Sequence, residues 1–103
     1  MAINIAGITF EDGPYPIAQA GKLKNAAGVY VIRCRSSSGN TLIDVGQSDK
    51  VRDRVMNHDR RECWGKNCKG ELEVAAIYIS DKQQRENIEK KIREQRTPPC
   101  GER

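Results

Sequence analysis

The sequence contains little that would point to a membrane or to secretion. No apolar run approaches the about 20 residues that a transmembrane helix needs, and the N-terminus lacks the basic-then-apolar order of a signal peptide. No repeat, linker or low-complexity tract divides the 103 residues. These absences predict a single cytoplasmic domain over residues 1–103 with no membrane partner.

Histidine is scarce, whereas charge is abundant. His58 is the only histidine, so any imidazole chemistry in the chain must use it. Charged residues make up 31% of the chain, and the net charge is +4. The basic excess lies mostly in residues 47–70 and 80–103. This is a modest electrostatic footprint for a phosphate backbone, and charge alone favours a solvated surface.

Cysteine occurs four times, at Cys34, Cys63, Cys68 and Cys100. An even count permits a disulfide framework in a secreted protein, but without a secretion signal we expect reduced, packed thiols. The alternative is a zinc-stabilised interaction domain with His58, Cys63, Cys68 and Cys100 as ligands. The four residues between Cys63 and Cys68 make a wider gap than the usual close pair.

Apolar alternation and turn residues predict the strands. Residues 36–40 form a hairpin turn signal in which Gly39 can adopt a positive φ. Residues 11–16 are dense in turn formers and predict an irregular connection. The strands expected are 3–10, 28–35, 41–45 and 71–79.

One helix is expected after strand 41–45 and another after strand 71–79. Ser48 is the predicted N-cap of a helix that buries Val51 and Val55. Residues 80–83 form a capping box for the last helix, and residues 59–70 are expected to be a basic loop. The order of elements predicts an α+β fold with helices packed on a small antiparallel sheet.

Two strand residues carry side chains suited to chemistry. Tyr30 is a mid-strand tyrosine, which core packing with the hydroxyl at the surface also explains. Asp44 is less ordinary, because aspartate is disfavoured in strands and apolar residues surround it. An acid in that place suggests a metal ligand, a base or a partner for Arg54. Whether Tyr30 and Asp44 share a face depends on the register.

The helices carry the other candidates. Arg54 and His58 are four residues apart and lie on one helix face. The Arg54 guanidinium there could hold a phosphate, or simply pair with Asp53 or Asp59. Glu89 lies at the edge of the apolar face of the last helix, where it could bind a divalent cation through oxygen. The ordinary alternative is ion pairing of Glu89 with Arg85 or Arg93.

Together these positions resemble the GIY-YIG nuclease family. Gly28-Val29-Tyr30 stands at the GIY position and Asp44-Val45-Gly46 at the YIG position. The resemblance covers about residues 27–101 and leaves 1–26 as an N-terminal extension. Further matches to the family pattern are Arg54, eight residues after Gly46, then His58, and Glu89 followed by Ile92, Pro98 and Pro99.

The resemblance implies a three-stranded antiparallel sheet flanked by helices and an endonuclease that cuts DNA with one divalent metal. Glu89 would bind Mg²⁺ or Mn²⁺, with no small-molecule cofactor, and Arg54 would stabilise the transition state. Tyr30 would act as general base or position the attacking water. His58 would assist proton transfer or hold Tyr30.

Two positions depart from the family pattern. The second tyrosine of the signature is Asp44 here, and the asparagine expected after the C-terminal prolines is Gly101. An ionised carboxylate cannot donate a hydrogen bond to a phosphate and would repel it. Asp44 would therefore add a metal ligand beside Glu89, or the chain is a catalytically degenerate nucleic-acid-binding module of the same fold.

The expected nucleic-acid partner is DNA, branched or damaged DNA included, with targeting supplied by substrate shape or a protein partner. Contacts to phosphates would be largely independent of sequence and sensitive to salt. Trp64 would offer a stacking surface for bases. The full set of expected contacts is Gln47, Ser48, Arg52, Arg60, Arg61, Trp64, Lys66 and Lys69.

Overall fold

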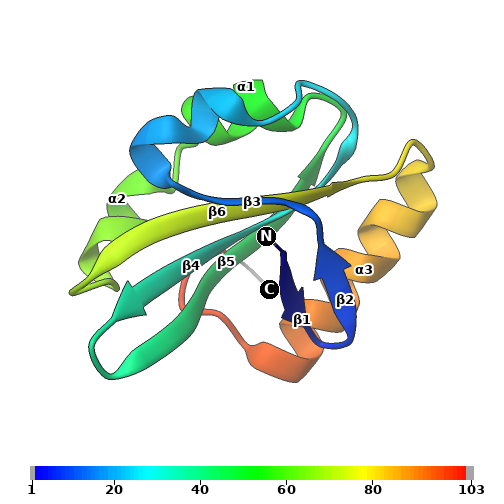
Figure 1. The fold of residues 1–103 in the computed structure, drawn as a ribbon. Helices are drawn as coiled ribbons and strands as arrows, with labels where there is room; N and C mark the ends of the chain where they lie inside the picture. Colours follow the sequence, from blue (N-terminus) through cyan, green and yellow to red (C-terminus); the bar gives the residue numbers. More distant parts are fainter. Residues whose placement is uncertain (1, 102–103) are drawn as a thin grey trace.

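The computed structural model describes residues 2–101 as an α+β fold built on a four-stranded antiparallel sheet and a separate two-stranded hairpin (Figure 1). Over these residues, no helix has the length and apolarity needed to cross a membrane. The elements in order are β1 (Ile3–Ile5), β2 (Ile8–Phe10), β3 (Asp12–Pro16), the 3-10 helix η1 (Ile17–Lys22), β4 (Gly28–Ser36), β5 (Gly39–Ser48), α1 (Val51–Met56), α2 (Arg61–Lys66), β6 (Glu71–Tyr78) and α3 (Lys82–Arg96).

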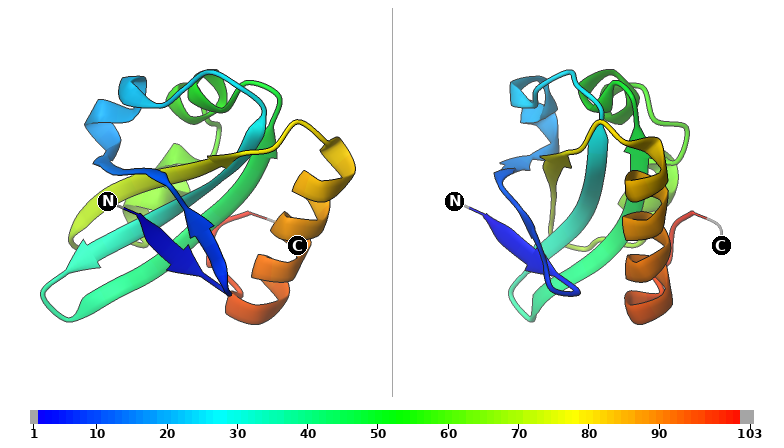
Figure 2. Two further views of the ribbon diagram at one scale, coloured as in Figure 1. Left: turned by 45° about the vertical axis from the view of Figure 1, so that its right-hand side comes forward. Right: turned by 90° about the vertical axis from the view of Figure 1, so that its right-hand side faces the viewer.

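The sheet has the strand order β3-β6-β4-β5, so β4 lies inside and β5 is an edge. Both faces of β4 are buried, as the alternation of its side chains predicts. Tyr30, Ile32 and Cys34 face a core covered by η1, α1 and α2. Val29 and Val31 face a second core, which the β1–β2 hairpin and α3 cover from the other side (Figures 1 and 2).

The register between β4 and β5 settles which residues share a face. Tyr30 lies opposite Gly46, and Ile32 lies opposite Asp44. Tyr30, Ile32, Asp44 and Gly46 therefore point to the same side of the sheet, toward α1 and α2. Gly39 takes a φ of 126° at the hairpin, in agreement with the prediction.

The N-terminal residues differ from the prediction. The expected strand 3–10 is a hairpin, turned where Ala6 and Gly7 have φ values of 54° and 81°. Residues 12–16, expected to be irregular, form edge strand β3 and pair with β6 through a shifted register. Pro14 is compatible with an edge strand, where a missing N–H is tolerated. The sheet thus has four strands and not the expected three.

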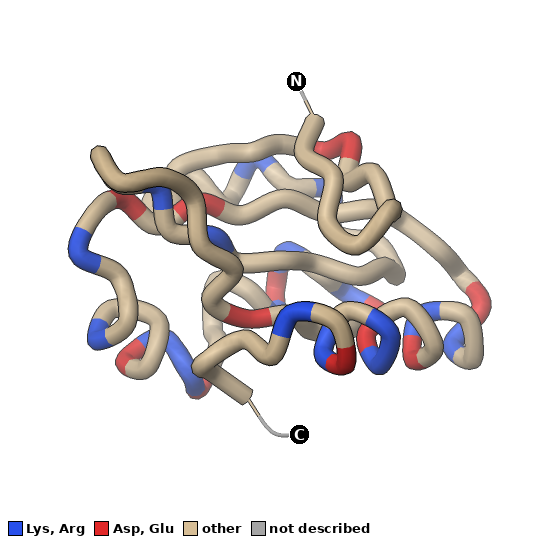
Figure 3. The backbone as a smooth tube through the Cα atoms, turned by 90° about the horizontal axis from the view of Figure 1, so that it is seen from below, with Lys and Arg blue, Asp and Glu red and all other residues tan. Residues whose placement is uncertain are grey.

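The helices also differ at their starts. β5 continues through Ser48, whose hydroxyl accepts a hydrogen bond from the Lys50 backbone N–H, so Ser48 is not the N-cap of α1. Val51 and Val55 are buried, as predicted. The expectation that Arg54 and His58 lie on one helix face is wrong, because α1 ends at Met56 and His58 follows its C-cap, Asn57. The expected loop 59–70 contains α2. The α3 helix begins after Asp81, whose carboxylate caps Gln83 N–H, and basic and acidic residues are interspersed along it (Figure 3).

Candidate functional site

A buried tyrosine–histidine pair lies where β4 meets the end of α1. Tyr30 Oη and His58 Nε2 are 2.6 Å apart, and both residues are almost fully buried. The Tyr30 ring lies over Gly46, since a Cβ at Gly46 would be 2.3 Å from Oη. Any larger residue at position 46 would displace the hydroxyl. The expectation that the tyrosine hydroxyl would lie at the surface is therefore wrong.

The hydrogen bonds of His58 define its tautomer. The backbone N–H of Arg60 donates to Nδ1 at 3.0 Å, so Nδ1 is an acceptor. Burial, together with the charges of Arg54 and Arg60, lowers the pKa of His58 to about 4, and the ring is neutral at pH 7. The single ring proton is thus on Nε2, which donates to Tyr30 Oη. The hydroxyl hydrogen of Tyr30 remains free to donate to another group.

The phenol is also held in its neutral form. Burial raises the pKa of Tyr30 to about 12, although the Arg54 charge opposes the rise. Only a very small fraction of a group with this pKa is ionised at pH 7. Tyr30 is therefore a poor general base in this arrangement and a good hydrogen-bond donor.

The lowered pKa of His58 predicts a pH dependence of stability. The unfolded chain takes up this proton near pH 6.5 and the folded chain only near pH 4. The stability that His58 contributes is fully present above pH 6.5 and is lost as the pH falls toward 4, by up to about 1.4 kcal/mol per pH unit. In urea denaturation, the stability advantage of wild type over His58→Gln should shrink across this range. If the difference in free energy of unfolding between wild type and His58→Gln stays constant from pH 6.5 to pH 4, the lowered pKa of His58 is contradicted.

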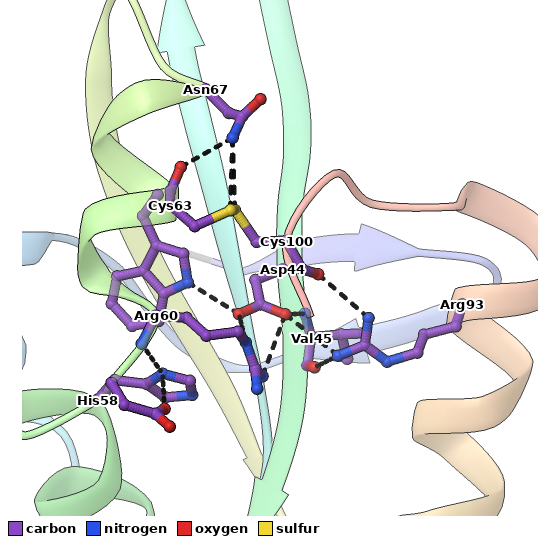
Figure 4. Close-up of a disulfide and its surroundings, with 10 residues drawn as sticks. Asp44, Val45, His58, Arg60, Cys63, Asn67, Arg93 and Cys100 are labelled. Carbon is purple, nitrogen blue, oxygen red and sulfur yellow. Dashed lines mark hydrogen bonds and ion pairs between the residues drawn. A yellow bond between two sulfur atoms is a disulfide. The ribbon is translucent and has the colours of Figure 1, made fainter. Parts of the chain in front are cut away.

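Asp44 is fully buried and is the most heavily hydrogen-bonded carboxylate of the site. Arg60 Nε donates to Oδ2 at 2.9 Å, and Trp64 Nε1 donates to the same oxygen at 2.8 Å. Arg93 Nη2 donates to Oδ1 at 3.2 Å, and Val45 N–H donates to it at 2.8 Å. Figure 4 shows Asp44 between Arg60 and Arg93. Both oxygens are occupied by donors, which argues against Asp44 as a metal ligand or a base.

The arginine partners of Asp44 are not the one that the sequence suggested. Arg54 instead contacts Asp59 at 3.4 Å, and its side chain is 39% exposed. Its charge acts on both Tyr30 and His58. A partly exposed guanidinium therefore lies beside the buried hydroxyl. Tyr30, Asp44, Arg54 and His58, all predicted from the sequence, form one cluster.

Glu89 lies on the other side of edge strand β5 from this cluster. Its only ion pair within residues 2–101 is a 3.4 Å contact with Arg93, the ordinary alternative that the helical spacing predicts. The same Arg93 donates to Asp44, so Glu89 is joined to the cluster indirectly. Glu89 lines an open pocket of about 660 Å³ between α3 and residues 97–101. Arg85 does not pair with it but binds Gln47 and two carbonyls.

The expected nucleic-acid contacts fall into two groups. Trp64 is fully buried, so the prediction of a stacking surface is wrong. Gln47 accepts a hydrogen bond from Arg85, and Arg61 donates to the carbonyls of Val55 and Met56. The Ser48 hydroxyl accepts a hydrogen bond from the Lys50 backbone N–H, and Arg60 donates one to Asp44. Of the eight expected contacts, only Arg52, Lys66 and Lys69 have side chains that make no hydrogen bond among residues 2–101.

All four cysteines are in disulfides, so the expectation of reduced thiols is wrong. Cys34 is bonded to Cys68 and Cys63 to Cys100. The alternative of a zinc site is also wrong, because cysteines in disulfides have no thiolate to bind the metal. No group of three or more metal-binding side chains occurs among residues 2–101. The Cys63–Cys100 bond ties α2 to the segment after α3, next to Asp44 (Figure 4).

Sequence reasoning missed the role of Arg93, which it treated only as a partner of Glu89. Arg93 also donates to the carbonyls of Val45 and Cys100 and so fastens α3 and the following segment to β5. No protein-family model, no curated protein and no solved structure matches the chain, so known proteins give no further guide to the site.

Proposed function

We propose that the chain is a divalent-metal-dependent DNA endonuclease of the GIY-YIG type. One observation carries the proposal: the buried Tyr30 hydroxyl accepts from His58, keeps a free hydrogen to donate, and lies beside the partly exposed charge of Arg54. A neutral donor next to a permanent cation suits the oxygens of a phosphodiester. Under this proposal, strands β4, β5 and β6 with their helices would correspond to the family core.

The roles follow from the protonation states. Tyr30, with a pKa of about 12, positions the attacking water or a phosphate oxygen and does not act as the base. His58 holds Tyr30, since its Nε2 already carries a proton. Arg54 stabilises the negative charge that develops on the phosphate, which is commonly worth about 3 kcal/mol for one well-placed donor.

The metal requirement of the family can be met by Glu89 alone. Magnesium is often carried by one or two carboxylates, water and the substrate phosphate. The Glu89 carboxylate is partly exposed, borders an open pocket, and has only a long contact to Arg93. Asp44 would not be a second metal ligand beside Glu89, because both of its oxygens already accept hydrogen bonds. When bound, the ion would polarise a phosphate oxygen as a Lewis acid.

The proposed function implies a substrate but does not fix a cellular location. DNA is the proposed partner, and Arg52, Lys66 and Lys69 are those of the expected basic contacts whose side chains have no hydrogen-bond partner among residues 2–101. The cytoplasmic location predicted from the sequence stays a proposal. The two disulfides weigh against it, because such bonds persist mainly in oxidising compartments.

A binding-only module of the same fold is the second candidate. The observation in its favour is that position 44 carries a carboxylate whose oxygens are fully engaged, so the phenol of the family signature has no equivalent there. Such a module would bind DNA in a salt-dependent way but would not need Glu89.

Glu89→Gln separates the two functions. We expect wild type to nick supercoiled plasmid with Mg²⁺ or Mn²⁺, and the variant to cut at least about 100-fold more slowly, because an amide is a poor ligand for these ions. The matched control is Glu71→Gln, which changes an exposed glutamate paired with Arg35 near the β4–β5 hairpin and should keep full activity. Equal cleavage by wild type and Glu89→Gln would overturn the metal assignment.

A further inference from the structure

Asp44 and Arg60 form a unit that the proposed mechanism has not used. The Arg60 guanidinium donates through Nε and Nη2 to the Asp44 carboxylate, at 2.9 and 3.4 Å. The Arg60 side chain is 29% exposed, whereas that of Asp44 is fully buried. A guanidinium has five N–H groups, so donors remain that Asp44 does not take.

The Arg60 charge is directed at the same place as that of Arg54. It acts on His58 and on Tyr30, as the Arg54 charge does. Arg60 also donates its backbone N–H to His58 Nδ1. One residue therefore fixes the imidazole tautomer with its main chain and brings a cation to the hydroxyl with its side chain.

The buried carboxylate cannot turn away from Arg60. Trp64 Nε1 holds Oδ2, while Arg93 and the Val45 N–H hold Oδ1. The negative charge of Asp44 is offset by Arg60, and Arg93 brings a second positive charge that it shares between Asp44 and Glu89. A carboxylate held in this way orients a guanidinium without repelling an approaching anion.

From this geometry we propose that Arg60 is a second phosphate-binding arginine of the site, beside Arg54, and that Asp44 is its positioning residue. The inference rests on the proposed function and deepens it. Arg60 supplies the hydrogen-bond donor that is lost where the family signature has a second tyrosine and this chain has Asp44. Two guanidinium charges that both act on one phenol suit a phosphodiester and not a neutral ligand.

The test is a double-mutant cycle in the plasmid assay with Arg60→Gln and Asp44→Asn. Each single variant is expected to lower kcat by about 100-fold, as for loss of one transition-state donor, with a much smaller change in KM. Arg60→Lys keeps the positive charge but lacks the paired N–H donors of the guanidinium, so its kcat should lie between those of wild type and Arg60→Gln. Because Asp44 acts through Arg60, the double variant should be no slower than either single one.

Two outcomes would overturn the inference: unchanged kcat in Arg60→Gln, or losses that add in the double variant, which would make Asp44 a merely structural residue. Arg35→Gln is the matched control and should be unaffected, because Arg35 is exposed, pairs with Glu71 and Glu73, and leaves Glu73 still paired with Arg33. The variants are compared below their melting temperatures, so that unfolding is not counted as lost activity.

The failure of the proposed function can be told apart from the failure of this inference. If wild type binds a fluorescein-labelled DNA duplex but never cuts it, the endonuclease proposal falls. Fluorescence anisotropy without metal then decides the inference. At least about 10-fold weaker binding by Arg60→Gln, with no change for Arg35→Gln, would support a phosphate contact, and equal binding would overturn it.

Discussion

Loss of either disulfide is expected to lower the free energy of unfolding by about 3 kcal/mol. The bonds close loops with sequence separations of 34 and 37 residues, a range in which cross-linking removes substantial entropy from the unfolded chain. A domain of this size has a total stability of about 5–15 kcal/mol. Removing both bonds should therefore leave the fold marginal at 37 °C.

The two disulfides should differ in their effect on the site. Urea denaturation of Cys34→Ser/Cys68→Ser and of Cys63→Ser/Cys100→Ser measures the two losses separately. Only the second pair should also slow cleavage, because Cys63 immediately precedes Trp64, whose indole holds Asp44. A wild-type melting temperature that does not change on adding dithiothreitol would contradict a stabilising role for either bond.

Replacing Asp44 with alanine is expected to lower the free energy of unfolding by about 3–5 kcal/mol. The change removes the shared partner of Arg60 and Arg93 and leaves the Trp64 indole N–H without its acceptor. Breaking a buried ion pair from one side has a cost of this size, since the remaining charge is left uncompensated.

The matched control for that experiment is Asp59→Ala. Asp59 is 76% exposed and its contacts with Arg54 and His58 Nδ1 are both long, at 3.4 Å, so its loss should change stability by less than about 1 kcal/mol. Urea denaturation at pH 7 measures both variants. Equal, small losses would show that the Asp44 network does not stabilise the fold and would remove the rigid anchor on which Arg60 depends.

The central strands and the last helix could be predicted because local pattern and tertiary structure agree there. β4 alternates between two cores, β6 is a largely apolar run that follows Gly70, and α3 begins at the capping residue Asp81. Tyr30 and Arg54 could be placed because a strand and a helix of known period hold them, whereas His58 lies beyond the end of α1 and comes to Tyr30 through the fold. Their hydrogen bonds, and hence the tautomer of His58, required the position of the Arg60 backbone.

The remaining errors come from features that local sequence does not determine. The turn formers in 11–16 suit a loop, but pairing with β6 gives them an edge strand. The position of Trp64 in a basic segment favours an exposed side chain, but the indole is buried and its N–H donates to Asp44. Four cysteines allow three pairings, and only the fold brings Cys63 to Cys100.

Cleavage by the wild-type protein tests the central claim most directly. Purified, oxidised protein is incubated at pH 7.5 with supercoiled plasmid in Mg²⁺, in Mn²⁺ and in EDTA, and the topological forms are separated on a gel. The account predicts nicked and linear products with either metal and none with EDTA. Plasmid that stays supercoiled with both metals, while the same protein retards it in the gel, would contradict a nuclease and leave the binding module.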